Sequence, residues 1–161
     1  MTQTLTPRFL IALATAGSAL VLASAFVFQA LGYAPCHLCL LQRWPHAAAI
    51  AIGLVILALR LPGWSGLAGM IAALTTMGLG IYHSGVERHI FAGPSDCTSS
   101  AVDSSLSAAD LMAQINSAPL VRCDEIPWEM FGVTMANLNV IASAVLAVIW
   151  LMAYLKSRPA L

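Results

Sequence analysis

Cys36-His37-Leu38-Cys39-Leu40-Leu41-Gln42-Arg43-Trp44-Pro45-His46 is the stretch that decides how this chain is placed in a membrane. The uncharged run that follows it, Ala47 to Leu59, would form a helix of about 20 Å, too short for a hydrocarbon core of roughly 30 Å. The helix must therefore begin earlier, near Pro35, a residue that suits the first turn of a helix. A start there predicts a span over residues 36–59 with both cysteines at its end, near the membrane surface.

The composition of the whole chain is typical of an integral membrane protein. Of its 161 residues, 60% are apolar and only 9% are charged, which leaves too little polar surface for a soluble globule. The formal net charge is zero and the cations do not cluster, so the basic surface that nucleic-acid binding needs is missing. All acidic residues lie between Glu87 and Glu129, which makes this segment a hydrophilic excursion.

Four uncharged or nearly uncharged stretches are long enough to cross a membrane. Arg60 to Gly63 forms a turn that makes the second and third of them an antiparallel hairpin, and Pro127 is a start signal before the fourth. The sequence therefore predicts an all-α fold, an integral membrane four-helix bundle in a single membrane domain over residues 1–161. Its spans are 9–31, 36–59, 64–86 and 130–155, with a loop over 87–129.

The first stretch has a second interpretation as a cleaved signal peptide. Arg8 precedes its apolar core, and Ala23-Ser24-Ala25 has the small residues of a processing site. The apolar run continues beyond that point through Phe28, which favours a membrane anchor.

Several small and polar residues inside the spans predict packing between helices. Asn137 and Asn139 are expected to form hydrogen bonds between helices. A residue at every fourth position of the third span is small, which allows a neighbouring helix to approach closely; these residues are Ala68, Ala72, Thr76, Gly80 and Ser84.

The loop is expected to contain one short helix. Ser107 to Asp110 resembles a capping box, and Leu111, Met112 and Ile115 follow on one face. An amphipathic helix lying on the membrane surface is the favoured interpretation, and a groove for a partner is the alternative.

An even number of spans places both ends of the chain on one side of the membrane. Arg8, the Arg60 turn, Lys156 and Arg158 make that side cytoplasmic by the positive-inside rule. All four cysteines then lie on the opposite side, in an oxidising compartment where disulfides persist.

The cysteines form two pairs, Cys36 with Cys39 and Cys97 with Cys123, and two pairs on one face invite thiol–disulfide exchange. Cys39 lies near a helix N-terminus with Arg43 one turn further on, and both features favour a thiolate. Such a thiolate at the lipid interface can pass electrons to an acceptor dissolved in the membrane, for which a quinone is the obvious candidate.

Other interpretations of these residues stay open at this point. The cysteines can form structural disulfides, or all four can converge on a zinc ion. Arg43 can be an interfacial anchor whose charge reaches water. His83 and Glu87, four residues apart, suit a proton relay but are equally compatible with ordinary interfacial positions.

The order and spacing of the motifs resemble the disulfide-bond formation protein B (DsbB) family over spans two to four and the loop. The motifs are Cys36-His37-Leu38-Cys39, Gln42-Arg43-Trp44-Pro45, Tyr82-His83-Ser84-Gly85-Val86-Glu87, Gly93-Pro94-Ser95-Asp96-Cys97, Arg122-Cys123-Asp124, Pro127-Trp128 and Phe131-Gly132. The resemblance implies a quinone-dependent oxidase of the bacterial inner membrane that reoxidises a periplasmic DsbA-like dithiol protein, with ubiquinone or menaquinone as the electron acceptor.

The resemblance also implies roles for single residues. Cys97 would form the mixed disulfide with the partner, Cys123 would exchange with Cys36, and Cys39 would face the quinone. The residues expected around the quinone are Gln42, Arg43, His46, Glu87 and Arg88. Gln42 and Arg88 depart from the family pattern, which can have an acidic residue and a histidine at these places; here the histidine, His89, comes one residue later.

Two further functions remain as alternatives. A vitamin K epoxide reductase-like bundle shares the number of helices and the CxxC chemistry, but in it the CxxC follows the loop cysteines, whereas here it precedes them. From a different class, the chain would be a non-catalytic membrane scaffold with two structural disulfides.

Overall fold

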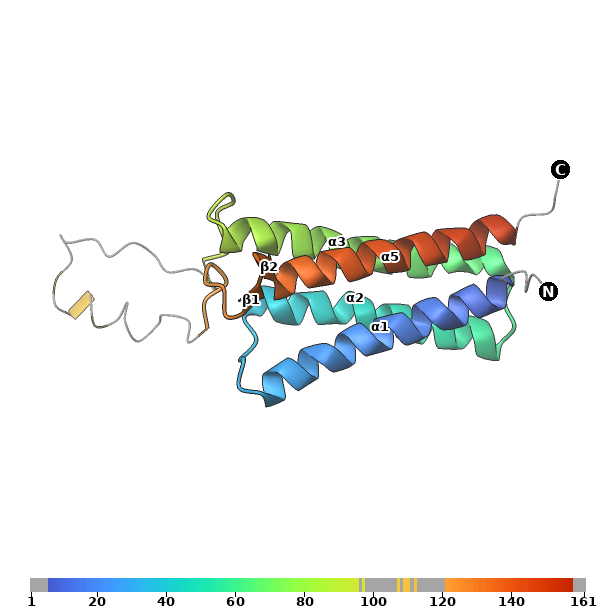
Figure 1. Cartoon of the computed structure of the whole chain (residues 1–161), viewed down its shortest axis with the longest axis horizontal. Helices are drawn as coiled ribbons and strands as arrows, with labels where there is room; N and C mark the ends of the chain where they lie inside the picture. Colours follow the sequence, from blue (N-terminus) through green and yellow to red (C-terminus); the bar gives the residue numbers. More distant parts are fainter. Residues whose placement is uncertain are drawn as a thin grey trace.

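The computed structural model describes residues 6–95, 97, 107, 109, 110, 112 and 121–157. Within them, four helices are long and apolar enough to cross a membrane, which confirms the predicted all-α four-helix bundle (Figure 1). The helices are α1 (Pro7–Ala30), α2 (His37–Ala58), α3 (Gly66–Glu87), which is preceded by the 3-10 turn η1 (Gly63–Ser65), and α5 (Met135–Lys156).

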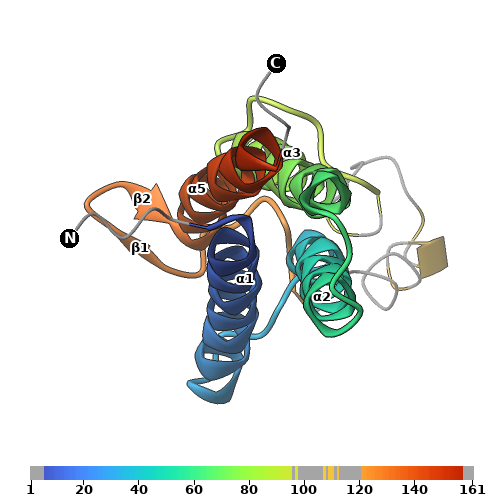
Figure 2. The same ribbon diagram turned by 90° about the vertical axis from the view of Figure 1, so that its right-hand side faces the viewer.

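The helices lie side by side, and α1 begins at the same end of the bundle at which α5 ends (Figure 1). α3 packs against both α2 and α5, while α1 packs against α2 and α5 (Figure 2). The start of α2, the end of α3 and the hairpin before α5 therefore meet at the opposite end, which we call the cysteine end because Cys36 and Cys39 lie there.

Small residues on α3 let α5 approach closely, as the sequence pattern predicted. Gly69 lies against the ring of Trp150, which is fully buried, and a Cβ atom at this position would clash with that ring. A Cβ atom at Gly80 would lie 2.8 Å from Val140 Cγ2 and 3.1 Å from Asn139 Nδ2, both on α5. Of the predicted stripe, only Ala68 is exposed.

α1 belongs to the core only through its first half. Its buried residues all lie between Leu10 and Ser18, and its second half diverges from α5 towards Ala30 (Figures 1 and 2). The main core, around Trp150 and Leu146, lies accordingly towards the end where α1 begins. The divergence leaves room between α1 and α5 at the cysteine end.

α5 begins at Met135, later than the apolar run that starts at Met130. Strands β1 (Glu129–Met130) and β2 (Val133–Thr134) pair as a short antiparallel hairpin, so their backbone groups are not available to a helix. Thr134 then caps α5: its hydroxyl accepts a hydrogen bond from Asn137 N at 3.2 Å, while Asn137 Oδ1 accepts one from Thr134 N. This capping box sets the start of the helix.

The predicted surface helix in the loop falls mostly outside the described residues, including Leu111 and Ile115. At its expected start, Ser107 Oγ accepts a hydrogen bond from Asp110 N at 3.2 Å. The same hydroxyl donates to Asp110 Oδ2 at 2.6 Å, and Met112 is exposed.

Candidate active site

Cys36 and Cys39 lie at the N-terminus of α2. Cys36 is the N-cap residue, and its Sγ accepts a hydrogen bond from the Cys39 backbone N–H at 3.2 Å. The two sulfur atoms are 2.8 Å apart; both cysteines are free, with Cys36 buried and Cys39 half-buried. The pair therefore lies at a helix N-terminus, where unpaired backbone N–H groups stabilise negative charge.

The other two cysteines, Cys97 and Cys123, form a disulfide with their Cα atoms 5.2 Å apart. Both are fully buried, and Cys123 N donates to Cys97 O at 2.6 Å. They pack with Cys36, Leu38 and Val86 in one buried cluster. The two pairs are therefore neighbours at the cysteine end, as exchange between them requires.

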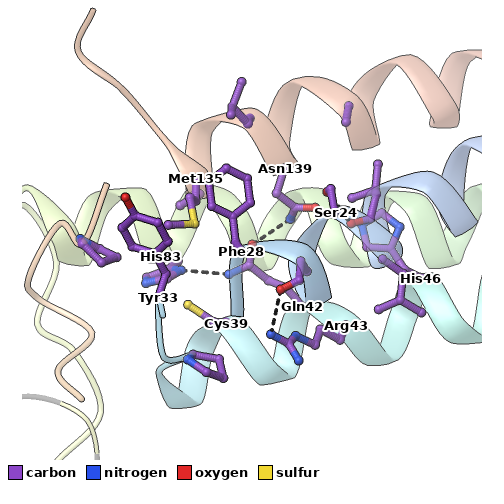
Figure 3. Close-up of a pocket in the computed structure, with 18 of the residues that line it drawn as sticks. Ser24, Phe28, Tyr33, Cys39, Gln42, Arg43, His46, His83, Met135 and Asn139 are labelled. Atoms are coloured by element: carbon purple, nitrogen blue, oxygen red, sulfur yellow. Dashed lines mark hydrogen bonds between the residues drawn. The ribbon is translucent and has the colours of Figure 1, made fainter. Parts of the chain in front are cut away.

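A cavity of about 320 Å³ lies beside Cys39, between α1, α2, α5 and the end of α3 (Figure 3). Its wall is mostly apolar; α1 contributes residues between Val21 and Phe28, and α5 contributes residues between Met135 and Ala142. Five of the residues expected at the active site line it, namely Cys39, Gln42, Arg43, His46 and Glu87, and so does His83, the candidate for a proton relay. Arg88 and His89 are not among the lining residues.

Gln42 is the centre of a chain of hydrogen bonds in the wall of this cavity (Figure 3). Its Nε2 donates to Leu38 O at 3.1 Å and contacts His83 Nδ1 at 2.8 Å. Its Oε1 accepts from Asn139 Nδ2 at 2.7 Å, and Asn139 Oδ1 lies 2.9 Å from His46 Nε2. Gln42 thus uses all its polar atoms to hold its neighbours.

Arg43 is held by α1. Its guanidinium donates to Gln29 Oε1 at 2.8 Å and to Ala25 O at 3.4 Å, and it lies 4.7 Å from the centre of the Phe26 ring. Its Nε is buried and has no partner among the described residues. The side chain therefore joins α2 to the diverging half of α1, at the cavity wall.

Glu87 and Arg88 have different surroundings although they are adjacent at the end of α3. Glu87 is buried, and its Oε2 accepts a hydrogen bond from Thr134 Oγ1 at 2.7 Å. Arg88 is exposed and donates to Gly132 O at 2.8 Å and to Asn137 Oδ1 at 3.1 Å. Glu87 faces the cavity, whereas Arg88 holds the β1–β2 hairpin against α5.

A two-point contact beside Cys123 orders the segment that carries it. Arg122 Nε donates to Asp124 Oδ1 at 3.0 Å, and its Nη2 donates to Oδ2 at 2.8 Å. The Arg122 guanidinium holds the pKa of the Asp124 carboxyl below its usual range, because it stabilises the carboxylate. The charged pair flanks Cys123 on both sides.

The geometry bears on the zinc alternative. Cys97 and Cys123 are bonded to each other and do not offer two thiolates, so the four-thiolate arrangement is not present in this structure. Among the described residues, Cys36 Sγ, Cys39 Sγ and a His83 ring nitrogen lie within 4.8 Å of one another and are the group that can share a metal ion.

Sequence reasoning assigned no cavity role to Phe28, Tyr33 or Met135, and it treated Asn139 only as a bond between helices. All four line the cavity. Phe28 packs edge-to-face on Tyr33, with ring centres 5.8 Å apart, and on Trp128, with ring centres 5.5 Å apart. No local spacing in the sequence indicates that Phe28, Tyr33 and Trp128 meet, because they come from α1, the following turn and the segment before β1.

Comparisons with known proteins agree with the resemblance seen in the sequence. The profile of the family described as disulfide bond formation protein DsbB matches residues 7–153. A protein of Rickettsia prowazekii (strain Madrid E), described as "Uncharacterized protein RP370", is 28% identical over 134 residues, which are 81% of this chain and 78% of that protein. No solved structure matches the chain.

Proposed function

The chain belongs to the DsbB family, and from this membership we propose that it oxidises a soluble DsbA-like dithiol protein and reduces a membrane quinone, ubiquinone or menaquinone. As a member of the family, it is a multi-pass inner-membrane protein and a disulfide oxidoreductase. The observation that carries the finer proposal is the position of Cys39, which contacts a cysteine beside the buried Cys97–Cys123 disulfide and also lines an apolar cavity.

We place the cysteine end in the periplasm. Arg8, Arg60 and Lys156 lie at or near the other end of the bundle, where α1 begins and α5 ends. Cations concentrate on the cytoplasmic side of inner-membrane proteins. The periplasm is also the compartment in which the disulfide and its soluble partner would meet.

Two buried polar atoms support a quinone ring as the occupant of the cavity. Arg43 Nε is an N–H donor without a partner among the described residues. His46 Nδ1 is an acceptor that likewise has no partner there. His46 Nδ1 is an acceptor because Nε2 faces Asn139 Oδ1 and therefore carries the proton. A quinone oxygen accepts hydrogen bonds, and the corresponding quinol hydroxyl donates them, so an apolar wall with one donor and one acceptor suits both forms.

The remaining site residues surround these two. Glu87 lines the cavity near the Cys36–Cys39 pair, and Gln42 holds Asn139, which in turn orients His46. Arg88 would act on the site indirectly, because it holds the β1–β2 hairpin through Gly132 O. A bound quinone would supply the capacity to accept two electrons and two protons.

The cysteines would pass electrons in sequence. A thiolate of the partner attacks Cys97, the Cys97–Cys123 bond breaks, and Cys123 becomes a thiolate. Cys123 then attacks Cys36, the Cys36–Cys39 disulfide of the oxidised enzyme breaks, and Cys39 becomes a thiolate that faces the cavity. The burial of Cys36, Cys97 and Cys123 in one cluster supports this order.

The test is a quinone-reduction assay with the purified protein in lipid and a reduced DsbA-like partner. Quinone absorbance should fall in proportion to the disulfide formed in the partner, and Cys39→Ser should abolish the reaction. Arg43→Ala should raise the KM for quinone about 10- to 100-fold, since a hydrogen bond to a charged group contributes about 1.5–3 kcal/mol. Arg60→Ala, in the turn between α2 and η1, is the matched control.

A full rate in Cys39→Ser would disprove the proposed electron path. The absence of any quinone reduction by the wild-type protein, with either quinone and a reduced partner, would favour the scaffold alternative.

A further inference from the structure

Cys36 Sγ lies between two N–H donors. One is the Cys39 backbone N–H at 3.2 Å, and the other is the ring of His83 on α3, whose Nε2 lies at 3.5 Å. Cys36 and His83 are both buried, with 4% and 3% of their surface exposed. Two converging donors in a site closed to water stabilise charge on the atom they face.

The direction of the His83 contact follows from Gln42. A carbonyl oxygen can only accept a hydrogen bond, so the Gln42 amide atom that contacts Leu38 O must be the nitrogen. For the same reason, the Asn139 amide atom that lies 3.3 Å from Thr76 O is its nitrogen. Gln42 Nε2 therefore donates to His83 Nδ1. A neutral His83 then has its proton on Nε2, where it points towards Cys36.

His83 is also close to the second cysteine pair. The backbone of Cys123 lies within reach of its ring, and Cys36 and Cys123 belong to the same buried cluster. Glu87 Oε1 lies 3.9 Å from His83 Nε2, beyond hydrogen-bond distance. The His83 N–H thus faces Cys36 Sγ, the sulfur atom that the exchange reaction uses, and the backbone of Cys123 is a second acceptor near the same ring.

We propose that His83 is a catalytic residue that donates its Nε2–H to the Cys36 thiolate, and that Gln42 is the positioning residue that keeps the proton on Nε2. The proposal rests on the proposed function and assigns His83 to one step of it. In that step the Cys97 thiolate, released when the partner leaves with its own disulfide, attacks Cys123. The Cys97–Cys123 bond forms, the Cys36–Cys123 bond breaks, and the electron pair stays on Cys36, while the proton remains on His83.

The test uses neither partner nor quinone, so its result is independent of the proposed function. In a Cys39→Ala background, one disulfide and one thiol remain. The protein is then a mixture of two forms, one with the Cys97–Cys123 disulfide and a free Cys36, the other with the Cys36–Cys123 disulfide and a free Cys97. Acid quenching, alkylation and peptide mass mapping at about pH 8, near the usual thiol range, give the ratio. His83→Ala should shift this ratio about tenfold towards Cys36–Cys123, the effect of losing a hydrogen bond to a charged group.

Two further variants separate this role from a structural one. His83→Gln keeps an N–H donor but has no imidazole, so it should stay within about threefold of the parent ratio. His37→Ala, an exposed histidine next to Cys36, should leave the ratio unchanged. An unchanged ratio in His83→Ala, or a shift in His83→Gln as large as in His83→Ala, would overturn the hydrogen-bond role.

The role of Gln42 has its own readout. Nitrogen-15 spectra of histidine-labelled protein should show His83 as one tautomer with the proton on Nε2. Gln42→Leu removes the donor to Nδ1 and should produce a mixture of tautomers together with a shift of the disulfide ratio. A single unchanged tautomer in Gln42→Leu would show that Gln42 does not position the ring.

Discussion

Asn139 Nδ2 on α5 donates a hydrogen bond to Gln42 Oε1 on α2 at 2.7 Å, in the wall of the cavity. The same nitrogen lies 3.3 Å from Thr76 O on α3, so one side chain connects three helices. Gly80 makes this approach possible, because a side chain there would occupy the space next to the Asn139 amide. The contact therefore holds three helices together and also fixes the positions of Gln42 and Asn139 in the cavity wall.

Asn139→Leu should lower the free energy of unfolding by about 1–2 kcal/mol, because it leaves the buried Gln42 Oε1 without a donor. Unfolding of the purified protein in mixed micelles by increasing amounts of dodecyl sulfate measures the change. The control is Thr75→Ala, which removes an exposed hydroxyl whose hydrogen bond, within the described part of the chain, is to Ile71 O of its own helix. Equal stability of the two variants would contradict the connecting role of Asn139.

Thr134→Val should destabilise the start of α5, since the Thr134 hydroxyl both caps the helix and donates to the buried Glu87 carboxylate. The loss of an N-cap alone costs about 1 kcal/mol, and the unpaired carboxylate adds to it. Thr134→Ser keeps the hydroxyl and should restore most of the stability in the same unfolding measurement. A Ser variant as unstable as the Val variant would show that the hydroxyl alone does not account for the stability that Thr134 provides.

Ala142→Phe should fill part of the cavity from α5 and raise the KM for quinone by about tenfold, equivalent to about 1.4 kcal/mol of lost binding. The first step, formation of the mixed disulfide between Cys97 and the partner, should keep its rate because it does not use the cavity. Val145→Phe adds a similar volume at an exposed position of the same helix and serves as the control. A slower first step with an unchanged KM would place the quinone elsewhere.

Asp124→Asn should destabilise the protein at neutral pH but not in acid. The pKa of Asp124 is lower in the folded protein than in the unfolded chain because Arg122 stabilises the carboxylate. A lowered folded pKa contributes stability above the unfolded value, and this contribution disappears as the pH falls through the folded pKa. Thermal unfolding of wild type and Asp124→Asn from pH 7 downwards should therefore converge below the usual aspartate range, roughly pH 4. A constant difference across this range would contradict the assignment.

The helices and the position of the Cys36–Cys39 motif at the end of a span could be predicted because they depend on local properties. Apolar runs long enough to span a membrane identify helices whatever their neighbours are. The short run after Pro45 required α2 to include the Cys36–Cys39 motif, and the structure starts α2 at His37. The start of α5 was harder, because the β1–β2 hairpin takes residues whose composition suits a helix equally well.

The site residues also fall into those that local spacing predicted and those that only packing between helices brings together. Cys39, Arg43 and His46 lie on one stretch of one helix, so their spacing already indicated a shared site. The sequence alone could not reveal that Arg43 is held by Gln29 on α1, that Asn139 reaches Gln42, or that Arg88 turns towards Gly132. These contacts join residues far apart in the chain, and which of them meet depends on how closely the helices pack.

The sequence by itself determined that the chain forms four membrane helices with a dithiol at the end of one of them, because hydrophobic length and motif spacing are properties of single segments. Only the tertiary structure decided that Cys36 faces His83, that Gln42 sets the direction of that contact, and that a cavity opens beside Cys39. The physical reason is that a hydrogen bond requires its donor and acceptor within about 3.5 Å, and such distances between helices arise only from packing.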